Sequence, residues 1–85
     1  MIYLFDHKEN LLGELKTDEL RFCQQEENLN GLMILDFELP LNLKDQMKDV
    51  EFVAHADVNN ENDFYFYKLI NCTNSDTAYH YKGIN

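Results

Sequence analysis

Histidine and cysteine are the residue types in this 85-residue sequence best able to do chemistry, and their spacing builds no site. His7, His55 and His80 show no HxxxH or HxH spacing and have no cysteine nearby in the chain, which argues against zinc. Neither Cys23 nor Cys72 has a neighbouring base or a helix start that would activate the thiol. We therefore expect two free, mostly buried thiols in a reducing compartment, and we expect His55 to point away from the core.

The acidic stretch 57–63 alternates oxygen-donating side chains, so a calcium site has to be considered. A loop of the EF-hand type needs Gly at its sixth position and Glu at its twelfth, but these positions hold Asn62 and Lys68. The stretch therefore predicts a solvated hairpin loop. The three glycines form no GxGxxG, Walker A or GxSxG motif. We expect no metal, no cofactor and no catalytic residue, and hence a protein that is not an enzyme.

The run Phe64-Tyr65-Phe66-Tyr67 is the strongest candidate for an interaction surface, because it is apolar on both faces of an expected strand. A strand of this kind lies inside a barrel or sandwich, or against a partner. Six Phe and five Tyr are a heavy load of large apolar groups for so short a chain, so part of this load is expected to be covered by a partner. The suggested interaction residues are Phe52, Phe64, Tyr65, Phe66 and Tyr67.

The charge balance of 7 basic against 16 acidic residues gives a net charge of −9. This balance argues against specific binding of nucleic acid or of an anionic membrane, since both favour a basic surface. It suits a basic protein partner. No signal peptide is expected at the start of the chain, and no stretch approaches the roughly 20 apolar residues of a membrane span.

The elements that position these residues are organised around one hairpin. Asn30-Gly31 predicts its turn, of type I′, because both residues tolerate positive φ. The alternation after the turn predicts a strand whose core face carries Met33, Leu35, Phe37, Leu39 and Leu41. Its partner strand is expected at 20–28, with a helix as the alternative. A two-residue loop would set Gln24 opposite Phe37 on the core face, so we expect a bulge or a longer loop.

The remaining apolar runs are separated by turn residues about every eight to twelve positions, which predicts further short strands. Pro40 ends the central strand, Gly13 suggests a bulge, and a short helix is expected near 42–49. The further strands are expected at 2–5, 11–15, 51–56, 64–72 and 77–82. The fold class is thus mainly β, or α+β at most: a small antiparallel β-barrel or sandwich of about six short strands. Residues 1–85 are expected to form one domain.

Several motifs follow one another along nearly the whole chain: Met1–Asp6, Asp18-Glu19-Leu20, Asn28–Gly31, Leu35–Pro40, Glu51–His55 and Phe64–Ile70. Together and in this order they resemble the start of the phage minor structural protein family of Gram-positive bacteria. These are the prophage tail, or tail-associated endopeptidase, proteins found at the distal end of long non-contractile tails.

The resemblance implies a β-rich tail-hub domain that forms a homo-oligomer around the tail axis, usually a trimer, and closes the tail tube beneath the distal tail ring. It implies a structural virion component, located in the tail and, during assembly, in the cytoplasm of the bacterial host. Cell-wall cleavage in this family belongs to segments well downstream, so we expect 1–85 to be a truncated hub domain without lysin activity. The alternative is a fragment of a cell-wall endopeptidase or a small carbohydrate-binding β-module that uses Tyr and Phe side chains.

Overall fold

The computed structural model describes residues 1–28, 30–57 and 60–85, without the side chains of 57–62. The strands are β1 (Ile2–Phe5), β2 (Leu11–Leu15), β3 (Phe22–Glu27), β4 (Met33–Pro40), β5 (Phe52–Asp57), β6 (Asn60–Asn74) and β7 (Ala78–Ile84). They form one seven-stranded sheet in the order β2-β1-β5-β6-β7-β4-β3, and every strand pairing is antiparallel. The mainly β fold class predicted from the sequence is therefore confirmed.

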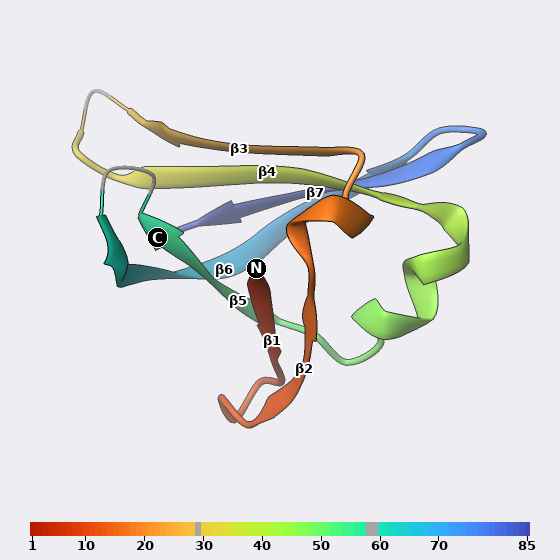
Figure 1. Cartoon of the computed structure of the whole chain (residues 1–85), viewed down its shortest axis with the longest axis horizontal. Helices are drawn as coiled ribbons and strands as arrows, with labels where there is room; N and C mark the ends of the chain where they lie inside the picture. The colour runs from red at the N-terminus through yellow and green to blue at the C-terminus, as the bar shows by residue number, and fades with distance from the viewer. Residues whose placement is uncertain (29, 58–59) are drawn as a thin grey trace.

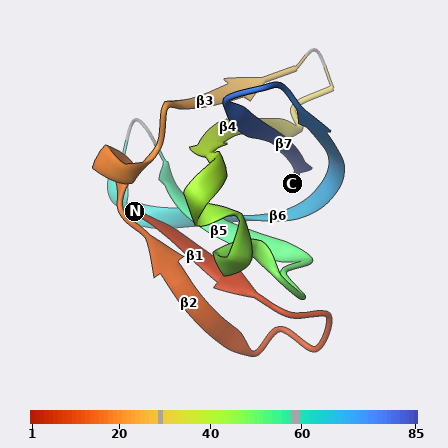
Figure 2. The same ribbon diagram turned by 90° about the vertical axis from the view of Figure 1, so that its right-hand side faces the viewer.

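The sheet curls around one core (Figure 1, Figure 2). β6 turns the sheet, because it pairs with β5 up to Lys68 and with β7 from Lys68 onward. A register shift between Leu69 and Asn71 marks an irregularity of the bulge type, which bends a strand and increases its twist. The edge strands β2 and β3 are joined through the 3₁₀ helix η1 (Thr17–Glu19). The result is an open antiparallel barrel with one interior.

The core follows the alternation of the central strand. Leu35, Phe37 and Leu39 are all 0% exposed, as predicted. Leu41, which was expected on the same face, is 42% exposed. That expectation was wrong because Pro40 ends β4 and Leu41 begins the 3₁₀ helix η2 (Leu41–Met47), where the strand alternation no longer applies. The buried cluster comprises Ile2, Leu4, Leu15, Leu35, Phe37, Leu39, Met47, Val53 and Tyr67.

The β3–β4 hairpin has a longer loop than the two-residue form. Cys23 pairs with Phe37, one position away from the pairing that a two-residue loop would give. The Asn28 N–H donates to the Leu32 carbonyl at 2.9 Å, so the loop closes around three residues. Gly31 has a φ of +79°. Because a two-residue type I′ turn would require a different strand register, the predicted type I′ turn was wrong, and the expected longer loop is confirmed.

The boundaries of the other elements differ modestly from those predicted from the sequence. β6 begins at Asn60 and ends at Asn74, so it is longer than the expected 64–72, and the short helix is the 3₁₀ helix η2. Of the loop expected at 57–63, residues 58–59 lie outside the described residues. The β1–β2 pairing shifts register beside Gly13, as expected of a bulge. In the described residues, no helix is long and apolar enough to cross a membrane.

Candidate functional site

Five aromatic side chains lie together on the outside of the barrel. They are Tyr3 and Phe5 on β1, Phe52 on β5, and Phe64 and Phe66 on β6. Each alternates along its strand with residues that point into the core, so it must point outward. We call this surface the aromatic face. It is the candidate functional site.

The rings of the aromatic face contact one another. Phe66 lies at the centre, with ring centroids 5.1 Å from Phe5 and 5.3 Å from Phe52. Tyr3 meets Phe64 edge-on, with centroids 5.7 Å apart and an interplanar angle of 60°. These separations lie in the range in which aromatic pairs attract. Even so, Phe64 is 52% exposed and Phe66 36% exposed, so much ring surface remains in contact with water.

Strand register explains why these rings meet. Tyr3, Ala54 and Phe66 lie side by side on three neighbouring strands. The small side chain of Ala54 leaves room above it, and Ala54 is 7% exposed although it points outward. The aromatic face is therefore continuous across β1, β5 and β6. It continues onto β2, where Leu11 pairs with Phe5 and is 62% exposed.

The structure divides the five interaction residues suggested by the sequence. Phe52, Phe64 and Phe66 share the aromatic face, whereas Tyr65 and Tyr67 point to the inside. Tyr67 is 0% exposed, and its hydroxyl accepts a hydrogen bond from the Gln25 side-chain amide. The two tyrosines are thus part of the interior, and the two faces of the run have different roles.

Sequence reasoning missed Tyr3 and Phe5. The signal was present, because the strand Ile2-Tyr3-Leu4-Phe5 is apolar on both faces, as is the run on β6. Four apolar residues in a row do not show which two face outward. Only the pairing of β1 with β5 places these rings beside Phe52 and Phe66.

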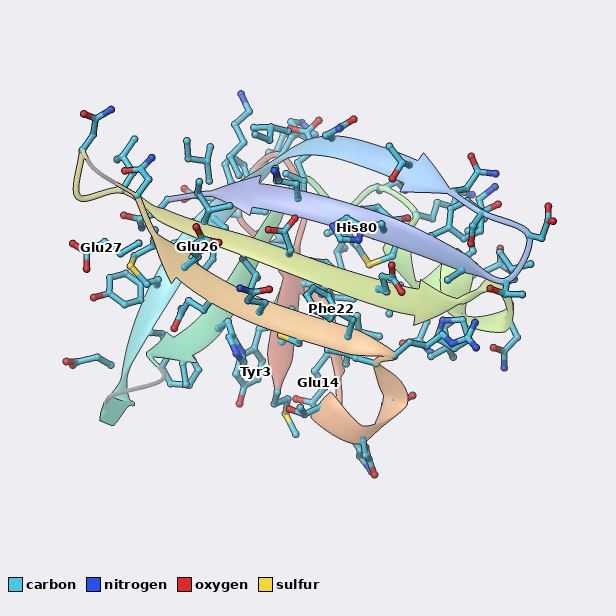
Figure 3. All side chains as sticks on the ribbon, turned by 90° about the horizontal axis from the view of Figure 1, so that it is seen from above. Tyr3, Glu14, Phe22, Glu26, Glu27 and His80 are labelled. Carbon is cyan, nitrogen blue, oxygen red and sulfur yellow. The ribbon has the colours of Figure 1, made fainter. Side chains whose placement is uncertain are left out.

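The opposite outer surface, on β3, β4 and β7, is mainly polar, although Phe22, Ile34 and Ile84 also lie on it. Its outward side chains include Glu26, Asp36, Glu38, His80 and Lys82, and we call it the polar face. Figure 3 views the molecule from this side, with Glu26 and His80 along it. The outer surface therefore has an aromatic half and a charged half.

His80 is the best-connected side chain of the polar face. Its Nε2 lies 2.9 Å from Asp36 Oδ1, its Nδ1 lies 3.3 Å from Glu38 Oε1, and its ring stacks on Phe22 with centroids 6.1 Å apart. Carboxylates only accept hydrogen bonds, so both contacts are favourable when the ring is an imidazolium. The hydrogen bond to Asp36, reinforced by Glu38, raises the pKa of His80. In the described residues, no group of three or more His, Cys, Asp or Glu could hold a metal ion.

His55 points inward, contrary to expectation. It follows Val53 on the core-facing side of β5, its Nδ1 lies 3.2 Å from the Met1 carbonyl, and its Nε2 lies 3.9 Å from Cys23 Sγ. Burial raises the pKa of the Cys23 thiol and lowers the pKa of His55. Both shifts favour a neutral thiol beside a neutral imidazole, the reverse of the thiolate–imidazolium pair of an activated cysteine.

The two cysteines are free, as expected, but they are not both buried. Cys23 is partly buried, whereas Cys72 is exposed. The expectation failed for Cys72 because β6 continues to Asn74, past the part of the strand that covers the core.

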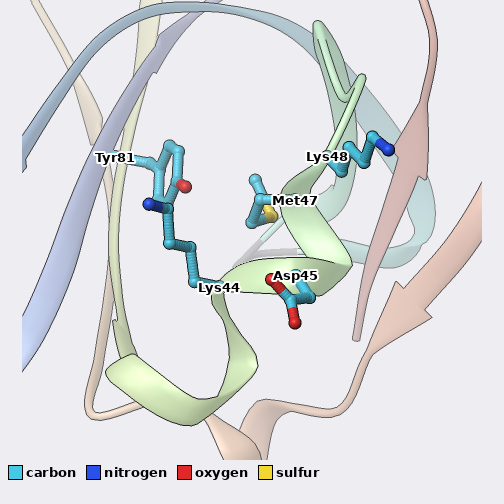
Figure 4. A pocket seen from close by; sticks show the side chains of 5 residues that line it. All are labelled: Lys44, Asp45, Met47, Lys48 and Tyr81. Atoms are coloured by element: carbon cyan, nitrogen blue, oxygen red, sulfur yellow. The ribbon is translucent and has the colours of Figure 1, made fainter.

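A small cavity of about 250 Å³ lies beside η2 and β7 (Figure 4). Ligand pockets more commonly span about 300–1,000 Å³. Burial raises the pKa of Tyr81 to about 12, so its phenol stays protonated near neutral pH and is a poor base. The Lys44 Nζ lies 5.0 Å from the centroid of the Tyr79 ring. The cavity is lined by Lys44, Asp45, Met47, Lys48 and Tyr81, which do not include a nucleophile paired with a base.

The aromatic face is therefore the feature with most capacity for function, and what it can do is bind. Its rings offer apolar contact area and no reactive group. Comparison of the chain with family models, curated proteins and solved structures found no match.

Proposed function

We propose that this protein is a non-catalytic structural component of a phage or prophage tail tip, which associates with itself and docks to neighbouring tail proteins. The observation that carries the proposal is the aromatic face. The tail assignment is supported by the ordered resemblance between the chain and the tail-hub family, and with it the location in the virion tail.

The aromatic face supports an interaction role because its composition is that of an interface centre. Exposed aromatic rings are enriched where proteins meet, and charged residues are depleted there. Tyr and Phe also bury a large apolar area for few rotatable bonds. A contiguous patch of this kind on a chain with a net charge of −9 is a surface to be covered in an assembly.

Light scattering coupled to gel filtration tests self-association. We expect the mass to rise above 10.1 kDa with concentration, and we expect Phe64→Ser to lower that rise, because Phe64 is 52% exposed and contributes to the aromatic face and not to the core. Phe22→Ser is the matched control, since Phe22 is 40% exposed on β3, away from the aromatic face. A wild-type protein that stays monomeric and binds no tail-ring protein would overturn the proposal.

The acidic charge supports a position beside the path of DNA, because a net charge of −9 repels a polyanion. A component of the tail channel must let DNA pass without binding it. We therefore expect no measurable DNA binding even at low salt, where electrostatic binding is strongest. Tight binding by this domain would exclude the channel role.

The alternative role on the bacterial cell wall uses the same rings, because the exposed faces of Phe64 and Phe66 could stack on sugars. Incubation with purified cell walls separates the two functions. Retention on the walls that Phe64→Ser abolishes, or release of peptide, would favour the carbohydrate-binding module or the endopeptidase fragment.

A further inference from the structure

We infer that the aromatic face packs against the aromatic face of a second copy of this chain, with Glu14 of each copy opposite Lys68 of the other. The inference rests on the self-association proposed above and names its surface, its symmetry and the charge pair that sets its register.

The distribution of charge favours a second copy as the occupant. Two chains of net charge −9 repel each other, so they approach most easily where charge is sparse. Among the described outward positions of β2, β1, β5 and the first half of β6, the charged ones are Glu14 and Lys68. A basic partner would instead be attracted to the polar face, which carries Glu26, Asp36 and Glu38.

The order of the strands places the two charges so that they complement each other. Glu14 on β2 pairs with Tyr3, at one margin of the aromatic face. Lys68 on β6 pairs with Phe52, at the other margin. Both side chains are exposed. The two charges lie in neighbouring outward rows, two residues apart along the strands. A two-fold axis that lies between the faces and is inclined to the strands therefore exchanges the two margins, so that each carboxylate faces the ammonium of the other copy.

The contact is isologous, because the same surface is used by both copies. Its centre is the cluster of rings around Phe66, and its rim is two equivalent Glu14–Lys68 pairs. A three-fold ring of the kind that the resemblance implies is built from two different surfaces. The contact in a three-fold ring and the face-to-face contact proposed here would therefore be different contacts. A mass measurement distinguishes them, because the first gives a trimer and the second a dimer.

A charge exchange tests the inference. Glu14→Lys and Lys68→Glu each place like charges at both rim contacts, and we expect each variant alone to associate about tenfold more weakly than wild type. Mixing the two variants restores both opposite-charge pairs. We expect the mixture to form a heterodimer of twice 10.1 kDa, measured by analytical ultracentrifugation with one variant labelled.

Glu26→Lys is the control for net charge. It changes the net charge from −9 to −7, as Glu14→Lys does, but at a position on the polar face. Mixed with Lys68→Glu, it forms one opposite-charge pair and one like-charge pair across the contact, so it is expected to give clearly less heterodimer than the Glu14→Lys mixture. Equal recovery in the two mixtures would overturn the inference, because the attraction would then be a property of net charge.

Salt provides a second readout on the wild-type chain. Because the copies carry the same charge, added NaCl screens their repulsion and is expected to strengthen the pair, whereas contact with a basic partner weakens with salt. A trimeric mass that the charge exchange leaves unchanged would overturn the face-to-face pair and leave the proposed function standing. A monomer at every concentration would overturn the inference, and a monomer that also binds no tail-ring protein would overturn the proposed function as well.

Discussion

Gly83 on β7 lies directly against Tyr67 on β6: a Cβ placed on Gly83 would stand 3.0 Å from the Cβ of Tyr67 and 3.5 Å from the Lys68 carbonyl oxygen. Tyr67 is 0% exposed, so it has little freedom to move away. The absence of a side chain at Gly83 is therefore what allows β7 to close against β6 on the inside of the barrel.

Gly83→Ala is expected to lower the free energy of unfolding by about 1–3 kcal/mol, because the added methyl overpacks a filled core. Urea unfolding followed by circular dichroism measures the change. Gly13→Ala is the control, since a Cβ there meets no atom within 4 Å. It is expected to alter stability by less than about 1 kcal/mol, in the stabilising direction. Equal losses in both variants would show that the close approach of β7 to Tyr67 has no energetic importance.

Leu39→Ala and Leu41→Ala test where the core ends. Leu39 is 0% exposed and Leu41 is 42% exposed, although the two are separated by Pro40 alone. We expect Leu39→Ala to cost about 2–5 kcal/mol of unfolding free energy through lost burial and the cavity it leaves. Leu41→Ala is expected to cost about 0.5 kcal/mol or less. Similar losses would mean that Leu41 packs in the core after all.

The alternation of polar and apolar residues was sufficient to predict the strands and much of the core. Leu35, Phe37 and Leu39 are separated by carboxylates, and only one face of such a strand can be buried. The sequence did not show that the alternation ends before Leu41, because Pro40 can be either the last residue of a strand or the cap of a helix. The type of the hairpin turn was predicted wrongly for a similar reason: Asn30-Gly31 fits more than one kind of turn.

Only part of the candidate site could be predicted from the sequence. In Phe64-Tyr65-Phe66-Tyr67 both faces are apolar, so alternation indicates two sets of residues without saying which set is inside. The short strand of Tyr3 and Phe5 has the same ambiguity. The pairing of β1 with β5, which joins segments about 50 residues apart, and the pairing of β5 with β6 resolve it. His55 was misplaced because a histidine between alanines gives no sign of the Cys23 and Met1 groups that surround it.

His80 is expected to make stability depend on pH near neutrality. Its pKa in the folded protein is raised above the ordinary value of 6.5, chiefly by the Asp36 carboxylate. The charged contact is therefore fully present below pH 6.5 and is lost as the pH rises through the folded pKa. We expect the free energy of unfolding of wild type to fall over this interval more than that of His80→Gln, measured by urea unfolding at closely spaced pH values.

Nuclear magnetic resonance titration of the His80 ring checks the cause of that shift. Asp36→Asn is expected to lower the pKa of His80 more than Glu38→Gln does, because the Asp36 contact is shorter, 2.9 Å against 3.3 Å. A pKa that neither variant changes would remove the carboxylates as its origin.

The two thiols are expected to differ strongly in reactivity. Cys72 is exposed, so a disulfide reagent reaches it in the folded protein. Cys23 is partly buried against His55, and burial raises the pKa of its thiol, which reduces the reactive thiolate. The release of thionitrobenzoate from Ellman's reagent should therefore be fast for Cys23→Ser, in which Cys72 remains, and slow for Cys72→Ser. Urea should abolish the difference, because unfolding exposes Cys23. Fast reaction of Cys72→Ser without denaturant would show instead that His55 activates the Cys23 thiol, and the neutral pair inferred from the burial of both groups would be wrong.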